Sequence, residues 1–284
     1  MKLLIFGQTG QVARELARRV PQGTTITQLS RAQADLSNPE ACAAAILASD
    51  ADAVLNAAAY TAVDRAEADE AAATMINATA PTAMAQACAA KGIPFLHIST
   101  DYAFDGAGTA PFHPDHPTAP LGAYGRSKLQ GEHGIGTSGG NTLILRTSWV
   151  FSSHGTNFLK SMLRLGRERP SLNVVADQIG GPTPASAIAD ALYTCAQAML
   201  NGTQGGIHHF TGSPDTSWAN FARAIMAAAN LPCEITDIHS TAYPTPAQRP
   251  LNSRLDCTSL ARFGLQRPDW RAALPEILHD LEPA

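Results

Sequence analysis

The sequence has few charged residues, and no charge of one sign is concentrated in any segment. Charged residues make up 15% of the 284-residue chain, and the net charge is −4. A nucleic-acid-binding surface needs a basic patch, and an anionic membrane attracts a polybasic cluster. Neither is present, so we expect no nucleic-acid partner, no membrane partner, and a small molecule as the ligand.

Paired cysteines and long apolar runs are also missing. The five cysteines are scattered without a Cys-x-x-Cys pair, and an odd number suits reduced thiols rather than a disulfide framework. The apolar run over residues 3–6 ends at Gly7, which makes it too short for a signal-peptide core or a membrane span. These features predict a cytoplasmic location.

Short apolar runs alternate with alanine-rich helical segments, and the 45% hydrophobic content is ample for a core. The expected strands cover residues 2–6, 24–29, 53–57, 95–98 and 143–150. Strands that are apolar throughout and separated by helices predict an α/β fold with a doubly wound parallel Rossmann-type sheet. We expect residues 1–150 to form the dinucleotide-binding domain. Residues 151–284 are less regular and predict mainly a smaller carboxyl-terminal substrate lobe, with some segments returning to the Rossmann domain.

A glycine turn follows the first strand, in the segment Gly7-Gln8-Thr9-Gly10-Gln11-Val12-Ala13. Gly7 permits a tight turn, Gly10 lets the backbone approach a pyrophosphate, and the small Ala13 allows close packing of helix on strand. The free amides at the start of the helix then hold the phosphates. The segment therefore predicts a dinucleotide site that includes Gly7, Thr9, Gly10, Gln11 and Val12. The alternative is a turn that merely connects strand and helix.

The second strand ends in Leu29-Ser30-Arg31 and lacks the acid that binds an adenosine ribose 2′-hydroxyl. A carboxylate there repels a 2′-phosphate, whereas Ser30 and Arg31 can hydrogen-bond one. This favours NADPH, with NADH as the alternative cofactor; Arg31 also fits a solvated loop. Small residues at the end of the third strand let a flat cofactor lie against the backbone. The remaining residues expected at the dinucleotide are Asp35, Leu36, Ala57, Ala58, Ala59, Tyr60 and Thr61.

Tyr124 and Lys128 are four residues apart in a predicted helix, so both project from the same face. A phenol with a pKa of about 10 is a poor proton donor near neutrality, and a nearby ammonium lowers that value. The spacing therefore suits proton delivery in a reductase. A pair at this spacing also occurs by chance on solvated helices, so the neighbouring motifs decide between the two interpretations.

Several motifs resemble a known superfamily. The glycine turn, Asn56-Ala57-Ala58-Ala59, Ser99-Thr100-Asp101-Tyr102 and the Tyr-x-x-x-Lys pair are similar to the extended short-chain dehydrogenase/reductases. Four further segments, over residues 103–106, 146–150, 177–183 and 249–253, resemble the dTDP-4-dehydrorhamnose reductase family. The resemblance extends from residue 2 to about residue 275.

The resemblance implies an NAD(P)H-dependent reductase that converts dTDP-4-dehydro-L-rhamnose to dTDP-L-rhamnose for cell-surface polysaccharide. It implies that Thr100 hydrogen-bonds the C4 carbonyl oxygen and that Tyr124 supplies the proton. Lys128 is expected to hold the nicotinamide ribose and keep the tyrosine acidic, so both Tyr124 and Lys128 also contact the cofactor. The residues that the resemblance places at the dTDP-sugar are Thr100, Asp101, Tyr102, Trp149 and Arg249.

One position departs from the family pattern. Some members hold a magnesium ion at a dimer contact with acids from the first helix and the carboxyl-terminal half. Glu15 is present, but Ser186 stands where another acid is expected. A single carboxylate is a poor magnesium site, so we predict no metal and leave a homodimer open.

Two other functions remain open at this level. One is an NDP-sugar epimerase, dehydratase or other ketoreductase of the same superfamily. The other is a non-catalytic dinucleotide-binding regulatory subunit, against which the intact Thr100, Tyr124 and Lys128 argue. The sequence also leaves open which face of the ketone receives the hydride.

Overall fold

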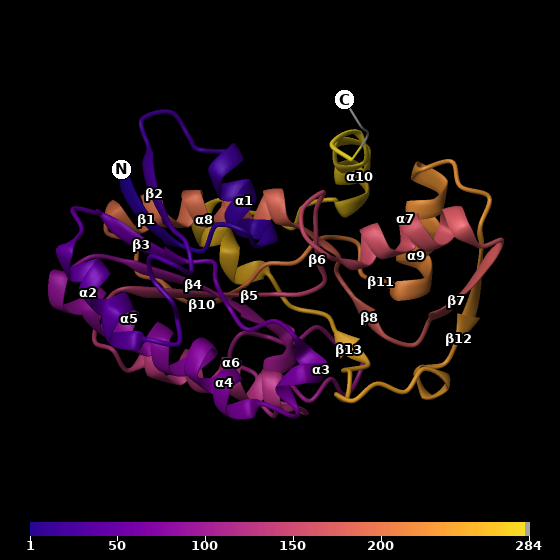
Figure 1. Ribbon diagram of the computed structural model, residues 1–284, viewed down its shortest axis with the longest axis horizontal. Coiled ribbons are helices and arrows are strands. Elements are labelled where there is room, and N and C mark those ends of the chain that lie inside the picture. The colour runs from indigo at the N-terminus through magenta and orange to yellow at the C-terminus, as the bar shows by residue number, and fades with distance from the viewer. Residues whose placement is uncertain (282–284) are drawn as a thin grey trace.

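A parallel sheet of six strands forms the core of the larger lobe in the computed structural model, which describes residues 1–281 (Figure 1). In spatial order its strands are β2 (Thr25–Leu29), β1 (Lys2–Phe6), β3 (Ala53–Asn56), β4 (Phe95–Thr100), β5 (Thr142–Thr147) and β10 (Gly206–His209). In register, Phe6 lies between Leu29 of β2 and Asn56 of β3. The predicted doubly wound parallel sheet is confirmed.

Helices cover both faces of the sheet, which is why its strands are apolar throughout. One face carries α1 (Gln11–Arg18) and α8 (Ala185–Leu200). The other carries α2 (Pro39–Ala48), α5 (Ala80–Lys91) and α6 (Ala123–Gly136), with the short α3 (Val63–Ala66) and α4 (Glu70–Thr74) nearby. The start of α2 is fixed locally, because the Asn38 side chain accepts from the Ala41 amide and Pro39 occupies the first turn.

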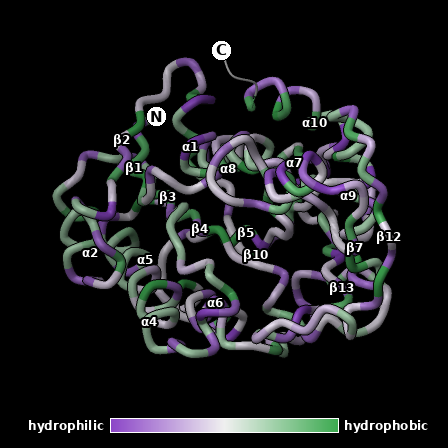
Figure 2. The backbone as a smooth tube through the Cα atoms, turned by 45° about the vertical axis from the view of Figure 1, so that its right-hand side comes forward, coloured by the Kyte–Doolittle hydropathy of each residue, from purple (hydrophilic) through white to green (hydrophobic). Residues whose placement is uncertain are grey.

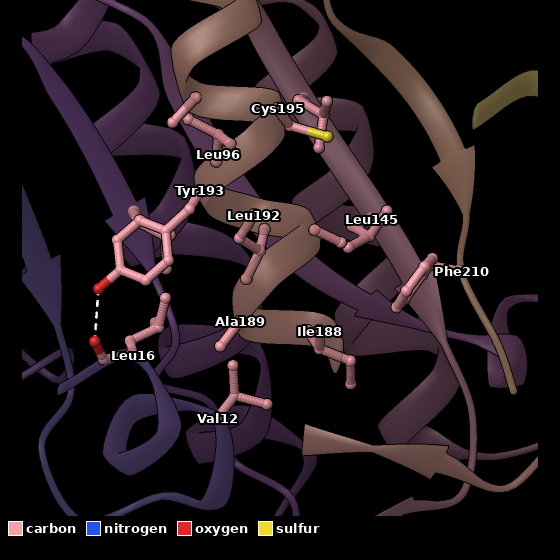
Figure 3. Close-up of a cluster of buried hydrophobic side chains, with 14 of the residues drawn as sticks. Val12, Leu16, Leu96, Leu145, Ile188, Ala189, Leu192, Tyr193, Cys195 and Phe210 are labelled. Atoms are coloured by element: carbon pink, nitrogen blue, oxygen red, sulfur yellow. Dashed lines mark hydrogen bonds between the residues drawn. The ribbon is translucent and has the colours of Figure 1, made fainter. Parts of the chain in front are cut away.

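The core on the α8 face joins segments that are distant in sequence (Figure 3). Ile188, Ala189 and Leu192 of α8 pack with Leu145 of β5 and Leu16 of α1. The buried Tyr193 hydroxyl donates to the Leu16 carbonyl oxygen, so α8 is joined to α1 by a hydrogen bond as well as by apolar contact. Although both follow residue 151, α8 packs on the central sheet and β10 is one of its strands.

A second lobe has its own apolar core and lies beside the sheet (Figure 2). It contains α7 (Phe158–Glu168), α9 (Trp218–Ala228) and α10 (Trp270–His279), with the parallel pair β7 (Ser171–Val175) and β12 (Glu234–Ile238). Short strands complete it: β6 (Val150–Phe151) with β9 (Thr183–Pro184), and β11 (Thr216–Ser217), β8 (Ile179–Gly180) and β13 (Asn252–Ser253). Within residues 1–281, no helix has both the length and the apolar character needed to cross a bilayer.

The strand order reverses between β1 and β3, because β2 lies on one side of β1 and β3 lies on the other. The loops after β1 and β3 consequently diverge and open a crevice at the carboxyl edge of the sheet. Gly7 turns the chain there with φ +110°, and a Cβ atom at this position would lie 3.3 Å from the Ala57 carbonyl carbon. The first glycine of the turn is thus required by both conformation and space.

Candidate active site

A groove of about 670 Å³ runs along the carboxyl edge of the sheet. Its wall is built from the ends of β1, β3, β4 and β5, from the start of α6 and from Trp218 at the start of α9. Most of the residues predicted for the site line it: Gly7, Thr9, Gly10, Gln11, Val12, Arg31, Asp35, Leu36, Ala57, Ala58, Ala59, Thr61, Thr100, Asp101, Tyr102, Tyr124, Lys128 and Trp149. Ser30, Tyr60 and Arg249 are not in the lining.

The glycine turn presents the amino terminus of α1 to the groove. Gly10 is the N-cap, no side chain caps the helix, and its first turn carries no acidic residue. Backbone amides and the helix dipole therefore face this end of the groove without a competing carboxylate, which fits a diphosphate.

The groove reaches the end of β2 beside Arg31. This exposed side chain donates from Nε to Asp35 Oδ2 at 3.0 Å. Ser30 bonds Gln33 instead, with 2.8 Å between Oγ and Oε1. Tyr60 is held through its backbone, because its amide donates to Asn77 Oδ1 at 2.8 Å. Of the two residues predicted to recognise a 2′-phosphate, only Arg31 faces the groove.

Thr100 at the end of β4 and Tyr124 in the first turn of α6 meet at the other end of the groove. The Thr100 side chain lies beside the Tyr124 side chain, and the Tyr102 ring packs edge-on against Tyr124 with 5.5 Å between ring centroids. The close approach of α6 depends on Gly125, where a Cβ atom would lie 2.3 Å from the Tyr102 carbonyl oxygen. Burial raises the pKa of Tyr124, and the neighbouring Thr100 side chain partly offsets this effect.

Lys128 lies one helical turn after Tyr124 and is 1% exposed. Its Nζ is 2.9 Å from His97 Nε2 and donates to the Ile98 carbonyl oxygen at 2.7 Å. Burial lowers the pKa of Lys128 to about 8. The sequence predicted that Lys128 makes Tyr124 more acidic. In this structure Lys128 Nζ lies against His97 instead, and burial is the largest influence on the pKa of Tyr124.

Asp101 presents a buried carboxylate at the same end. Its Oδ1 accepts from the Thr100 hydroxyl at 3.1 Å, whereas Oδ2 has no hydrogen-bond partner among the described residues. Burial raises the pKa of Asp101 to about 6. An unpaired buried acceptor in a groove suits a ligand hydroxyl.

Trp149 adopts φ +50°, a conformation that non-glycine residues rarely take. Its indole stacks on Trp218 with 3.6 Å between ring centroids and 12° between the planes. Gly180 makes room for it, since a Cβ atom there would lie 2.9 Å from the Trp149 ring. The two rings form one aromatic wall that joins the sheet to the second lobe.

Arg249 lies outside the groove lining. Its Nη2 is 2.6 Å from Asp64 Oδ2, and its Nη1 is 3.4 Å from the Tyr102 hydroxyl. It thus reaches the site through Tyr102. In the first helix, the Glu15 carboxylate is 3.0 Å from His154 Nε2 and 3.7 Å from Arg18 Nη1. Across residues 1–281, no group of three or more potential metal ligands is assembled.

Sequence reasoning missed part of the lining. The omitted residues include Asn56, Ser99, Thr147, Ser148, Gly155, Thr156 and Trp218. Small polar residues at the end of the fifth strand are a signal for Thr147 and Ser148, because parallel strands end at the same edge. Trp218 and the loop at Gly155 carry no local signal, since packing of the second lobe brings them to the groove.

The structure combines a doubly wound sheet, a glycine turn before α1 and the set of Thr100, Tyr124 and Lys128. Together these features define a dinucleotide-dependent reductase of the extended short-chain class. The chain matches the family model described as RmlD substrate binding domain over residues 1–282. It is 45% identical to the dTDP-4-dehydrorhamnose reductase of Burkholderia thailandensis over 99% of both chains. It is 40% identical to that of Escherichia coli over 99% of this chain and 98% of the relative. The chain belongs to the dTDP-4-dehydrorhamnose reductase family.

Solved structures agree with this assignment. The dTDP-4-dehydrorhamnose reductase of Clostridium acetobutylicum superimposes with a TM-score of 0.93 at 31% identity and 99% coverage of both chains. The enzyme of Bacillus anthracis, solved in complex with NADP, gives a TM-score of 0.92 at 30% identity, covering 98% of this chain and 99% of that one.

Proposed function

We propose that this protein is a dTDP-4-dehydrorhamnose reductase, which uses NADPH to reduce the C4 ketone of dTDP-4-dehydro-L-rhamnose to dTDP-L-rhamnose. The observation that carries the proposal is the juxtaposition of Thr100 and Tyr124 at one end of a groove whose other end is a glycine turn. The activity in the names of the relatives and the NADP bound to the Bacillus anthracis enzyme support it.

The residues of the groove fit a dinucleotide. The diphosphate would lie at the amides that follow Gly7 and Gly10, which no side chain caps. The guanidinium of Arg31 would pair with a 2′-phosphate, for which its planar donors are suited. Bound NADPH supplies the hydride.

Tyr124 would protonate the C4 oxygen, so that a full alkoxide does not form. Thr100 lies beside the Tyr124 side chain, and its hydroxyl would turn from Asp101 to donate its hydrogen to the same substrate oxygen. Lys128 would hold the nicotinamide ribose as an ammonium, and its charge would then favour loss of the phenolic proton.

Four other residues are proposed at the sugar nucleotide. Asp101 would accept from a sugar hydroxyl through its unpaired Oδ2. The stacked Trp149 and the hydroxyl of Tyr102 would border the sugar. Arg249 would exchange its bond to Asp64 for the substrate diphosphate. We place this reaction in the cytoplasm, which the five free and buried cysteines support.

Cofactor turnover and cofactor identity test the proposal against its enzymatic alternative. The purified protein should oxidise NADPH only when the ketone is supplied, one NADPH for each product formed. An epimerase or dehydratase would instead release tightly held NAD on denaturation and show no net consumption. A protein that binds NADPH without turning over any sugar nucleotide, and that stably captures a protein partner, would support the regulatory-subunit alternative.

A further inference from the structure

Three buried side chains form a single hydrogen-bonded chain beside the groove. Asn56 Nδ2, at the end of β3, is 3.1 Å from His97 Nδ1 in β4. His97 Nε2 is 2.9 Å from Lys128 Nζ in α6. Each of the three side chains is at most 1% exposed. Buried polar groups have to find partners within the protein, so donors and acceptors must match along this series of three side chains.

The direction of these hydrogen bonds is fixed at Asn56. The Ala58 amide can only donate, and it donates to Asn56 Oδ1 at 3.0 Å. The Asn56 amide nitrogen, which also only donates, must therefore face His97. His97 Nδ1 accepts this bond and carries no hydrogen, so in the neutral ring the hydrogen lies on Nε2.

This tautomer determines which form of Lys128 fits. The Nε2–H group of His97 points its hydrogen at Lys128 Nζ. An ammonium has three donors and no acceptor, whereas a neutral amine has one lone pair. Only the neutral amine can accept from His97 and still donate to the Ile98 carbonyl oxygen. Burial acts in the same direction, because it lowers the pKa of Lys128 to about 8 and lowers that of His97 well below its usual value.

The surrounding charges do not oppose this arrangement strongly. Glu132, one turn after Lys128, favours the charged lysine, but its carboxylate is shared with Arg146 of β5 at 2.5 Å. Tyr124 is kept neutral by burial, and Asp101 is hydrogen-bonded to Thr100. Three more charged side chains lie on α6 or on elements packed against it, and each has a partner other than Lys128. Glu67 accepts from the Ala123 amide, and Glu70 pairs with Arg126.

We propose that, at alkaline pH, Asn56 and His97 hold Lys128 as a neutral amine, and that binding of the dinucleotide at that pH is therefore accompanied by uptake of one proton at Lys128. This rests on the proposed function, which requires Lys128 to meet the nicotinamide ribose as an ammonium. One proton passes from the buffer to Nζ, and the hydrogen bond from His97 Nε2 breaks. Asn56 and His97 are positioning residues that act through Lys128.

Titration calorimetry of NADPH binding, in buffers of different ionisation enthalpy, measures this proton directly. At about pH 9, uptake should be close to one proton for each NADPH bound. The measurement uses the Tyr124→Phe variant, so that the phenol does not titrate. A 2′-phosphate with a pKa of about 6 is already ionised at this pH and does not contribute. Binding without proton uptake would overturn this inference but not the proposed function. Absence of NADPH binding would contradict the proposed function as well.

An isosteric change at Asn56 should reverse the direction of the hydrogen bonds that run from residue 56 through His97 to Lys128. In the Asn56→Asp variant, one carboxylate oxygen still accepts from Ala58 and the other accepts from His97 Nδ1–H. Nε2 then becomes an acceptor for a charged Lys128, so proton uptake should fall to nearly zero while NADPH still binds. Asn220→Asp is the matched control on the exposed surface of α9, where the side chain accepts from Arg223 at 2.9 Å, and it should retain the full uptake. Full uptake in Asn56→Asp would refute the mechanism.

The tautomer can also be observed in the unmodified protein, which keeps the inference testable if the Asn56 variant does not fold. Nitrogen-15 NMR of the histidine rings, with His97 assigned from a His97→Gln variant, should show a hydrogen on Nε2 and none on Nδ1. A hydrogen on Nδ1 would contradict the proposed directions of the hydrogen bonds at His97.

Discussion

Tyr124→Phe removes the proposed proton donor and little else. The phenyl ring keeps its place against Tyr102, and only the hydroxyl and its interaction with Thr100 are lost. The Thr100 hydroxyl is not left unpaired, since Asp101 Oδ1 accepts from it at 3.1 Å. The effect on activity therefore reports the missing proton rather than a disordered site.

The expected loss is large for catalysis and small for stability. A positioned general acid contributes about 10²–10⁴-fold to the rate, which corresponds to roughly 3–5 kcal/mol in the activation free energy. Loss of one buried hydrogen bond costs about 1 kcal/mol of unfolding free energy, or roughly 2 °C in Tm for a chain of this size. Binding of NADPH should be retained.

The assay is steady-state oxidation of NADPH with the ketone, combined with thermal melting and calorimetric binding of NADPH. Tyr193→Phe is the matched control, because it removes a tyrosine hydroxyl that bonds Leu16 in the core, away from the groove (Figure 3). It should lower Tm by a similar amount and leave kcat unchanged. A Tyr124→Phe protein that turns over like the unmodified one would show that the proton comes from another group.

Three further predictions concern the ends of the groove. Burial raises the pKa of Asp101 to about 6, so its carboxylate forms as pH rises through that value; kcat/KM for the sugar nucleotide should rise over the same range, and Asp101→Asn should remove that rise from the pH–rate profile. In Gly180→Ala, the new methyl would lie 2.9 Å from the Trp149 ring; the KM for the sugar nucleotide should rise about tenfold while the KM for NADPH is unchanged. Arg31→Ala should weaken binding of NADPH about 10–100-fold, the value of a charge-assisted hydrogen bond, and leave NADH binding nearly unchanged, which calorimetry can compare directly.

The features that could be predicted from the sequence are those that a few contiguous residues determine. The turn at Gly7 and Gly10, the small residues at the end of β3 and the apolar strands each leave a local pattern, and the structure places them at one edge of a parallel sheet. The spacing of Tyr124 and Lys128 likewise follows from one turn of helix.

Features created by contacts between distant segments were not predictable in the same way. Trp218 reaches the groove because α9 packs beside the sheet, and no residue near it in sequence indicates this contact. The position of Lys128 against His97 depends on how deeply α6 is buried on β4, and that burial also raises the pKa of Tyr124 where the local pattern indicated a lower value. A spacing rule gives the direction of a side chain but not its solvation.

The fate of the nicotinamide hydride shows whether the protein reduces the C4 ketone with NADPH. The protein is incubated with NADPH that carries deuterium at the transferable C4 position, together with dTDP-4-dehydro-L-rhamnose, and the product is examined by NMR. We expect dTDP-L-rhamnose with deuterium at C4 of the sugar, formed in step with oxidation of the cofactor. A product without deuterium at that carbon, or no oxidation of NADPH in the presence of the ketone, would contradict this expectation.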